Sequence, residues 1–306
     1  MIAGSLVDIR EEIVRLKNKK RAIILAHNYQ RDEIQEIADY TGDSLGLSKK
    51  AASIQDKELI VFCGVYFMAE TAKILSPDKK VIIPDRGAGC PMADMITAQQ
   101  VREFRNKYPG SVVVCYVNST AEVKAESDMC CTSANAVQVV LSLPADKTIL
   151  FVPDRYLGDF VRKKTSRNIV CWKGFCPTHA RVTRDMVLAA RKKHPNAVVL
   201  VHPECTEDVV DAADEAMSTG QMIAYVKKSG RTEFIIGTEK GILYQLKKEN
   251  PRKDFYLVGK DVICPNMKKI DLQKLLVSLQ EEQDEVVVAP AIMERARKAI
   301  SAMLLL

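Results

Sequence analysis

The sequence predicts an α/β protein built from three similar units, each a parallel β-sheet between layers of helix. Apolar, β-branched runs alternate with stretches of helical periodicity, this alternation occurs three times, and each copy ends in a Cys-Pro pair. Parallel strands joined through helices form a three-layer αβα unit. We expect the units to be arranged with pseudo-threefold symmetry around a central cleft.

Each unit opens with a helix followed by a strand. The helices are expected to begin at Ser5, Thr97 and Thr183, which are 92 and 86 residues apart. The strand of each unit ends in a polar cluster; the three clusters are His27-Asn28-Tyr29, Tyr116-Val117-Asn118 and His202-Pro203-Glu204. Helix-start signals follow at Asp32, at Ser119 with Glu122 as a capping box, and at Thr206.

A second pair of small polar residues lies about fifteen residues after each cluster. These pairs are Asp43-Ser44, Thr132-Ser133 and Ser218-Thr219, and we expect them to act as further helix N-caps. A strand, a helix and another strand complete each unit, with strands expected at 60–64 and 81–85, 149–153 and 168–172, and 234–238 and 255–259.

The repeat spacing defines the expected domains. These are 1–88, 89–174 and 175–262, followed by a closing segment, 263–306, that packs back on the first unit. This segment contains a fourth helix start at Asp271. Close packing is expected because no Gly/Ser-rich or Pro-rich linker separates the units.

Composition excludes several classes of protein. The 306 residues are 47% hydrophobic and 27% charged, which argues against a disordered chain and a coiled coil. No apolar run approaches the ~18 residues of a membrane span, and the acidic N-terminus does not fit a signal peptide, so we expect a cytoplasmic protein with no membrane partner. A modest net charge of +6, with bases interspersed among acids, does not favour nucleic acid.

Three matched cysteines give the strongest signal for function. Cys90, Cys176 and Cys264 each precede a proline and lie 86 and 88 residues apart. A single such cysteine is most simply a small buried residue, but three in register indicate a shared site for a soft metal. Iron–sulfur clusters normally have four thiolate ligands, so three would leave one iron open. Zinc bound by three cysteines and water is the alternative, although structural zinc sites usually use closely spaced ligand pairs.

The other cysteines have simpler interpretations. With no export signal, nine cysteines do not indicate a disulfide framework. Cys63, Cys115 and Cys171 lie in apolar strands and are expected in the core.

The predicted cleft has the character of an anion site with acid–base groups. Helix N-termini carry partial positive charge, and Ser44, Ser133 and Thr219 add hydroxyl groups at matched positions, although each hydroxyl could simply cap its own helix. The polar clusters provide proton donors and acceptors. These are His27, His202, Tyr29, Tyr116 and Glu204. His179, three residues after Cys176, could lie near the metal site.

Six motifs, in order, carry a resemblance to a known family. They are AHNYQ with GDS, PDRGAGCPMAD, YVNSTAEVKAESDMCCTSANA, GFCPTHA, VHPEC with STGQM, and CPNMKK. Together they resemble the quinolinate synthase family over nearly the whole chain. The resemblance implies a [4Fe–4S] cluster on Cys90, Cys176 and Cys264, and condensation of iminoaspartate with dihydroxyacetone phosphate to quinolinate, releasing phosphate and water on the route to NAD. An enzyme that supplies the imine could be a partner.

The resemblance also implies roles for individual residues. Tyr29 would assist proton transfer, with His27 beside it. Tyr116 and Asn118 would orient the bound intermediate. Glu204 would act as the general base, with His202 as a partner for a carboxylate or hydroxyl group. Carboxylate or phosphate would be held by hydroxyl groups, which by motif are those of Ser44, Ser133, Ser218 and Thr219. Some members carry extra cysteines around the third ligand; Asp261 and Met267 stand there in this chain, so a disulfide switch is not expected.

Two functions of other classes remain open at the level of sequence. A non-catalytic iron–sulfur protein, either an electron carrier or a redox sensor, would need a fourth ligand, and no fourth matched cysteine is present. A solute-binding module that uses helix-end anion sites would not need the thiols to bind its ligand.

Overall fold

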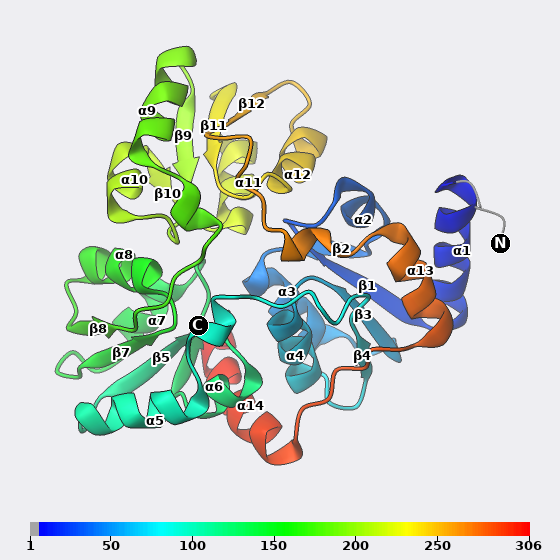
Figure 1. Cartoon of the computed structure of the whole chain (residues 1–306), viewed down its shortest axis with the longest axis horizontal. Helices are drawn as coiled ribbons and strands as arrows, with labels where there is room; N and C mark the ends of the chain where they lie inside the picture. The colour runs from blue at the N-terminus through cyan, green and yellow to red at the C-terminus, as the bar shows by residue number, and fades with distance from the viewer. Residues whose placement is uncertain (1–5) are drawn as a thin grey trace. The chain divides into compact units, whose positions relative to one another are not determined.

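The computed structural model describes residues 6–306 and contains three four-stranded, all-parallel sheets (Figure 1). The α/β fold class predicted from the sequence is therefore confirmed, while the predicted start at Ser5 lies outside the described residues. The chain forms two compact units. The first comprises the described residues up to Cys90 together with Cys264–Pro290, and the second comprises Pro91–Ile263 with Ala291–Leu306.

The first unit contains one sheet, in the order β2-β1-β3-β4. Its strands are β1 (Ala22–His27), β2 (Tyr40–Gly42), β3 (Leu59–Cys63) and β4 (Lys80–Ile82). Its helices are α1 (Leu6–Lys19), α2 (Asp32–Ile37), α3 (Ser44–Ser53), α4 (Tyr66–Leu75), η3 (Asn266–Lys268) and α13 (Leu272–Glu281). Every residue of β1 and β3 is buried, as expected for parallel strands that are covered on both faces.

The second unit contains two sheets of the same order, β6-β5-β7-β8 and β10-β9-β11-β12. The strands are β5 (Val112–Tyr116), β6 (Met129–Cys131), β7 (Ile149–Val152), β8 (Ile169–Cys171), β9 (Val198–Val201), β10 (Glu215–Ala216), β11 (Glu233–Gly237) and β12 (Asp254–Leu257). The helices are η1 (Ala93–Met95), α5 (Ala98–Lys107), α6 (Ala121–Ala125), α7 (Ala136–Ser142), α8 (Arg155–Thr165), η2 (His179–Arg181), α9 (Arg184–Lys193), α10 (Glu207–Ala212), α11 (Thr219–Lys228), α12 (Ile242–Glu249) and, from its second residue, α14 (Pro290–Leu304).

The C-terminal segment is shared between the two units. Helix α13 runs beside α1 in the first unit, where Glu282 pairs with Lys20 at 2.6 Å and with Lys80 at 2.9 Å (Figure 1). Helix α14 belongs mainly to the second unit, where Arg295 pairs with Glu126 at 2.9 Å. The division into three domains remains a prediction.

Most helix starts agree with the sequence prediction. The N-caps of α5, α9, α3, α11 and α13 are Thr97, Thr183, Asp43, Ser218 and Asp271, and each side chain accepts a backbone N–H from the first turn. Thr206 precedes α10 without a side-chain cap bond, and Asp32 is the first residue of α2.

Two predicted caps are wrong because a local turn delays the helix. Thr120, rather than Ser119, caps α6, because the Ser119 hydroxyl donates to the Tyr116 carbonyl at 2.8 Å. Helix α7 follows Asn135 rather than Thr132-Ser133, because the Asn135 Oδ1 accepts the Thr132 N–H at 2.8 Å and closes a turn before the helix.

An aspartate before each short edge strand recurs in all three sheets. Asp39, Asp128 and Asp214 lie 89 and 86 residues apart. Each carboxylate accepts a backbone N–H of the neighbouring central strand at 2.7–2.8 Å. It also pairs with a base on the helix that precedes this central strand; the bases are Lys17, Arg105 and Arg191. Side chain and backbone together therefore attach each edge strand to its sheet.

The pH dependence of stability should change on replacing Asp214 with Asn. Burial raises the pKa of Asp214, but hydrogen bonds from Arg191 and the Val199 N–H outweigh burial and lower it. A lowered folded pKa means that ionised Asp214 stabilises the fold above its unfolded pKa of about 3.9, and that this contribution is lost as the pH falls through the folded pKa. Because the group is largely exposed, we expect at most about 1 kcal/mol.

Urea unfolding of the metal-free protein between about pH 3 and pH 7 would measure this effect. The difference between wild type and Asp214→Asn should shrink towards acid pH, whereas Asp146→Asn in an exposed loop should change little at any pH. A difference that grows on acidification would contradict the prediction.

None of the helices in the described part of the chain is both long enough and apolar enough to cross a membrane.

Candidate functional site

The carboxyl ends of β5 and β9 bring four predicted residues together in the second unit. Tyr116 is the last residue of β5, with Asn118 in the following turn, while His202 and Glu204 follow β9. β5 and β9 are equivalent strands of the two sheets in this unit, and their carboxyl ends lie at the same level. Residues 86–88 positions apart in sequence therefore meet in space.

Glu204 is the hub of this cluster. Its Oε1 accepts the Tyr116 hydroxyl at 2.5 Å and the Asn118 amide at 3.4 Å. Its Oε2 lies 2.6 Å from the Nδ1 of His179 and 3.7 Å from the Nδ1 of His202. Glu204 is only 3% exposed, so a buried carboxylate is surrounded by four hydrogen-bonding groups.

The surroundings set the charge of Glu204 and Tyr116 in opposite senses. Burial alone would raise the pKa of Glu204, but electrostatic interactions with His202 and His179 and the hydrogen bonds from His179 and Tyr116 outweigh it and lower the pKa. Burial and the Glu204 charge raise the pKa of the Tyr116 hydroxyl well above its usual value. Glu204 is therefore ionised at neutral pH while Tyr116 keeps its proton.

Cys176 lies beside this hub. Its Sγ is 3.2 Å from the Nδ1 of His179, three residues further along the chain. One ligand atom each from Cys176, His179 and Glu204 can be chosen so that all lie within 4.8 Å of one another, an arrangement that could hold a metal ion.

Sequence reasoning missed two buried residues of this site. The Thr238 Oγ1 lies 2.7 Å from the His179 Nε2, and Asp154 is fully buried and electrostatically coupled to Glu204. Burial and the Glu204 charge raise the pKa of Asp154 well above its usual value. Asp154 lies two residues after β7, and Thr238 lies one residue after β11. Ligands of parallel α/β sheets bind at the carboxyl ends of the strands, the argument that identified Tyr116, and it applies to these two residues as well.

The first unit carries a second part of the predicted site. The His27 and Tyr29 rings pack edge to face with centroids 4.6 Å apart, and the Tyr29 N–H donates to the His27 Nδ1 at 3.1 Å. Lys268, on the turn after Cys264, donates to the Tyr29 carbonyl. Arg31 reinforces this link by donating to the Lys268 carbonyl at 2.9 Å.

The loops of Cys90 and Cys264 are tied together within this unit. The Nζ of Lys269 donates to the Gly87 carbonyl at 2.6 Å, and Lys274 pairs with Asp85 at 2.6 Å. Both thiols are half-buried, as is that of Cys176. Five other cysteines are fully buried; these are Cys63, Cys115, Cys130, Cys131 and Cys205.

The predicted anion-binding hydroxyls differ in what they contact. Ser218 is fully buried and caps α11, with its Oγ accepting the Gln221 N–H at 3.2 Å, which is the simpler interpretation considered above. Thr219 and Ser44 begin α11 and α3. Ser133 is half-buried and lies near the Tyr116 hydroxyl, whose pKa it tends to lower.

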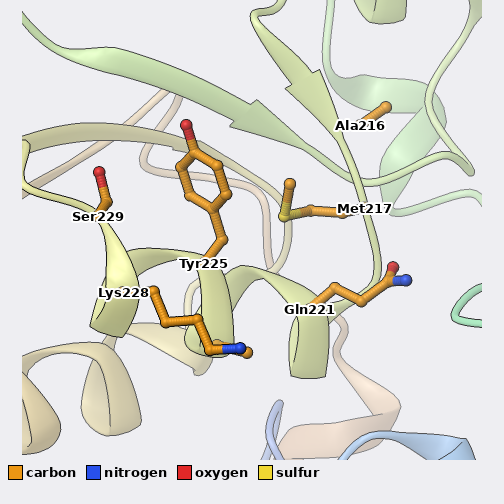
Figure 2. A pocket seen from close by; sticks show the side chains of 7 residues that line it. Ala216, Met217, Gln221, Tyr225, Lys228 and Ser229 are labelled. Carbon is orange, nitrogen blue, oxygen red and sulfur yellow. The ribbon is translucent and has the colours of Figure 1, made fainter.

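The second unit has a hollow of about 640 Å³ beside the start of α11. Figure 2 shows Gln221, Tyr225 and Lys228 projecting from α11 on one side of it, with Ala216 and Met217 nearby. None of the predicted site residues lines this hollow.

Comparison with known proteins agrees with the geometry. The family described as quinolinate synthetase A protein matches residues 11–305. A quinolinate synthase from Dehalococcoides mccartyi is 55% identical over 296 residues, which is 97% of each chain. Those from Caldicellulosiruptor bescii and Methanoregula boonei are both 53% identical, covering 97% of this chain and 97% and 98% of their own lengths. The chain therefore belongs to the quinolinate synthetase A family, and it is an enzyme.

Proposed function

We propose that the chain condenses iminoaspartate with dihydroxyacetone phosphate to form quinolinate, with release of phosphate and water, as a step towards NAD. The observation that carries the proposal is the convergence of Tyr116, Asn118 and His179 on one buried, ionised carboxylate, Glu204, beside a half-buried thiol. Such a carboxylate is already ionised at neutral pH, which is the form that a general base must have before a condensation or dehydration step.

A [4Fe–4S] cluster on Cys90, Cys176 and Cys264 is part of this proposal. The residues fit the group: all three thiols are half-buried, each lies shortly before a short 3₁₀ turn, and thiolates are the usual ligands of such clusters. When bound, a cluster with three protein ligands supplies an iron with an open position that acts as a Lewis acid. The division at 1–88, 89–174 and 175–262, the pseudo-threefold arrangement and the closing role of 263–306 belong to the same proposal.

The protein side chains would orient the substrates and move protons. The Asn118 Oδ1 is buried and has no hydrogen-bond partner in the described part of the chain, which leaves an acceptor for a substrate group. Tyr116 would deliver a proton and Glu204 would remove one, with His202 and His179 stabilising its charge. Tyr29 and His27 would assist further transfers, and the hydroxyls of Ser44, Ser133, Ser218 and Thr219 would hold carboxylate or phosphate. Supply of the unstable imine by a partner enzyme and a cytoplasmic location complete the proposal.

Anaerobic purification with iron, sulfide and quinolinate analysis tests this function. We expect a brown protein with about four irons and four sulfides per chain that forms quinolinate from the two substrates. Metal-free protein is the control and should be inactive.

A single metal ion is the competing arrangement. The Cys176, His179 and Glu204 ligand atoms are close enough to hold one ion, and this mixed donor set suits zinc. A colourless protein containing one zinc and no sulfide would favour that site and refute the cluster.

A further inference from the structure

Two of the three strand-end turns are held by a side chain from the helix that follows them. In the first sheet, the Gln35 Nε2 donates to the carbonyls of Asn28 and Gln30 at 3.1 and 2.9 Å. In the second sheet, the Lys124 Nζ donates to the carbonyl of Ser119. Each turn is therefore attached to its helix by a side chain as well as by the backbone.

These two contacts occupy equivalent positions of the repeat. Gln35 and Lys124 lie 89 residues apart, as do the acceptors Gln30 and Ser119. Gln35 is the fourth residue of α2, and Lys124 is the fourth residue of α6. In the third sheet, the fourth residue of α10 is Val210, whose side chain cannot donate a hydrogen bond. Two chemically different side chains thus make the same bond, so the bond itself is the shared feature.

Lys124 is a charged residue with no exposed surface. Lysine is almost never fully buried unless it is paired or hydrogen-bonded, so the bond to the turn helps to offset the loss of hydration. Its acceptor, Ser119, is also buried and directly follows Asn118, and the Ser119 hydroxyl donates to the Tyr116 carbonyl at 2.8 Å. Lys124 is therefore bonded to the turn that carries Tyr116 and Asn118.

The side chains carried by these turns need a fixed backbone. The Tyr116 hydroxyl lies 2.5 Å from the Glu204 Oε1, and a displacement of about 1 Å at an active site can cost about 100-fold in rate. We propose that Lys124 and Gln35 are positioning residues, each fixing the turn that carries the site residues of its own sheet through a hydrogen bond to a turn carbonyl. This inference rests on the proposed function, because it takes Tyr116 and Tyr29 to act on the substrates.

Two substitutions of Lys124 separate its hydrogen bond from its charge. Met has a similar length but cannot donate, so Lys124→Met should leave the buried Ser119 carbonyl without this donor. Gln is uncharged, and at the equivalent position of the first sheet it reaches the equivalent carbonyl. Lys124→Gln is therefore the conservative rescue.

Gln35→Met is a second test that removes the equivalent bond without removing a charge. It does not depend on whether the fold tolerates the loss of a buried cation. Lys253→Met is the matched control, because the Lys253 Nζ also donates to backbone carbonyls, those of Val226 and Ser229. Lys253 directly precedes β12, so its contacts lie at the amino end of a strand, opposite to the end that carries the site residues.

The measurements are backbone hydrogen–deuterium exchange and the kcat and KM of quinolinate formation, on the anaerobic, metal-loaded protein. We expect residues 116–120 in Lys124→Met, and residues 27–31 in Gln35→Met, to exchange at least about 10-fold faster than in wild type, since a lost contact favours local opening. Because the site residues then leave their productive position, kcat should fall about 10-fold in both variants at unchanged iron content. Lys124→Gln and Lys253→Met should stay within about 2-fold of wild type.

Three results would overturn the inference. These are wild-type exchange of the turns in Lys124→Met and Gln35→Met, faster exchange with unchanged kcat, and a loss in Lys124→Gln equal to that in Lys124→Met, which would make the charge decisive. Failure of the wild type to form quinolinate would instead refute the proposed function, while the exchange rates would still test the contacts.

Discussion

Replacing Glu204 with Gln is expected to lower quinolinate formation at least about 100-fold while leaving the metal content unchanged. Gln keeps the shape of the side chain and an oxygen to accept the Tyr116 hydroxyl, which lies 2.5 Å away in the wild type. An amide cannot take up a proton at neutral pH, so the step that needs a base should slow. General acid–base groups contribute about 10²- to 10⁴-fold to rate.

Steady-state turnover and iron analysis on the same preparation would measure this effect. Glu207→Gln is the matched control, because Glu207 is exposed three residues further along and pairs only on the surface with Lys163. Unchanged quinolinate formation in Glu204→Gln would contradict the role of Glu204 as general base. Electron transfer by a non-catalytic iron–sulfur protein would not depend on Glu204. Loss of iron in Glu204→Gln would instead assign Glu204 to metal binding.

The repeat explains how much of this site was predictable. Tyr116 and Glu204 are 88 residues apart, yet Tyr116 ends β5 and Glu204 follows β9, which are equivalent strands of two sheets with the same order. The sequence period alone therefore predicts that they lie at the same level. Asp39, Asp128 and Asp214 show that even an ion pair is repeated in register. Hydrophobic patterning predicted the long buried strands for the same reason, because burial on both faces requires a continuous apolar run.

What the sequence did not reveal depends on short-range hydrogen bonding. Strands β2, β6 and β10 have only two or three residues, too few to show an apolar period, so their pairing could not be predicted from hydrophobic patterning. Helix α7 begins later than the predicted Thr132-Ser133 because the Asn135 side chain closes a turn before the helix. Asp154 was overlooked because its burial and its proximity to Glu204, 50 residues further along the chain, become apparent only once the two sheets are folded.

Changing any one of Cys90, Cys176 and Cys264 to Ser should reduce the iron content from about four to well below one per chain and abolish quinolinate formation. Only three thiolates would hold the cluster, so loss of one would leave two protein ligands for four irons. A serine oxygen is a poor ligand for soft metal centres. Because the three thiols are half-buried in loops, rather than packed in the core as Cys63 is, the metal-free variants should keep their fold and melting temperature.

Cys171→Ser makes this test specific. Cys171 is also half-buried and lies five residues before Cys176, but it is in β8 and precedes no proline. Iron, sulfide and visible absorbance measured on all four variants should single out the Cys-Pro thiols, with Cys171→Ser retaining its cluster. Four irons in Cys176→Ser would remove that thiol from the ligand set, and substrate binding unaffected in Cys90→Ser would favour a solute-binding module over an enzyme whose substrate meets the metal.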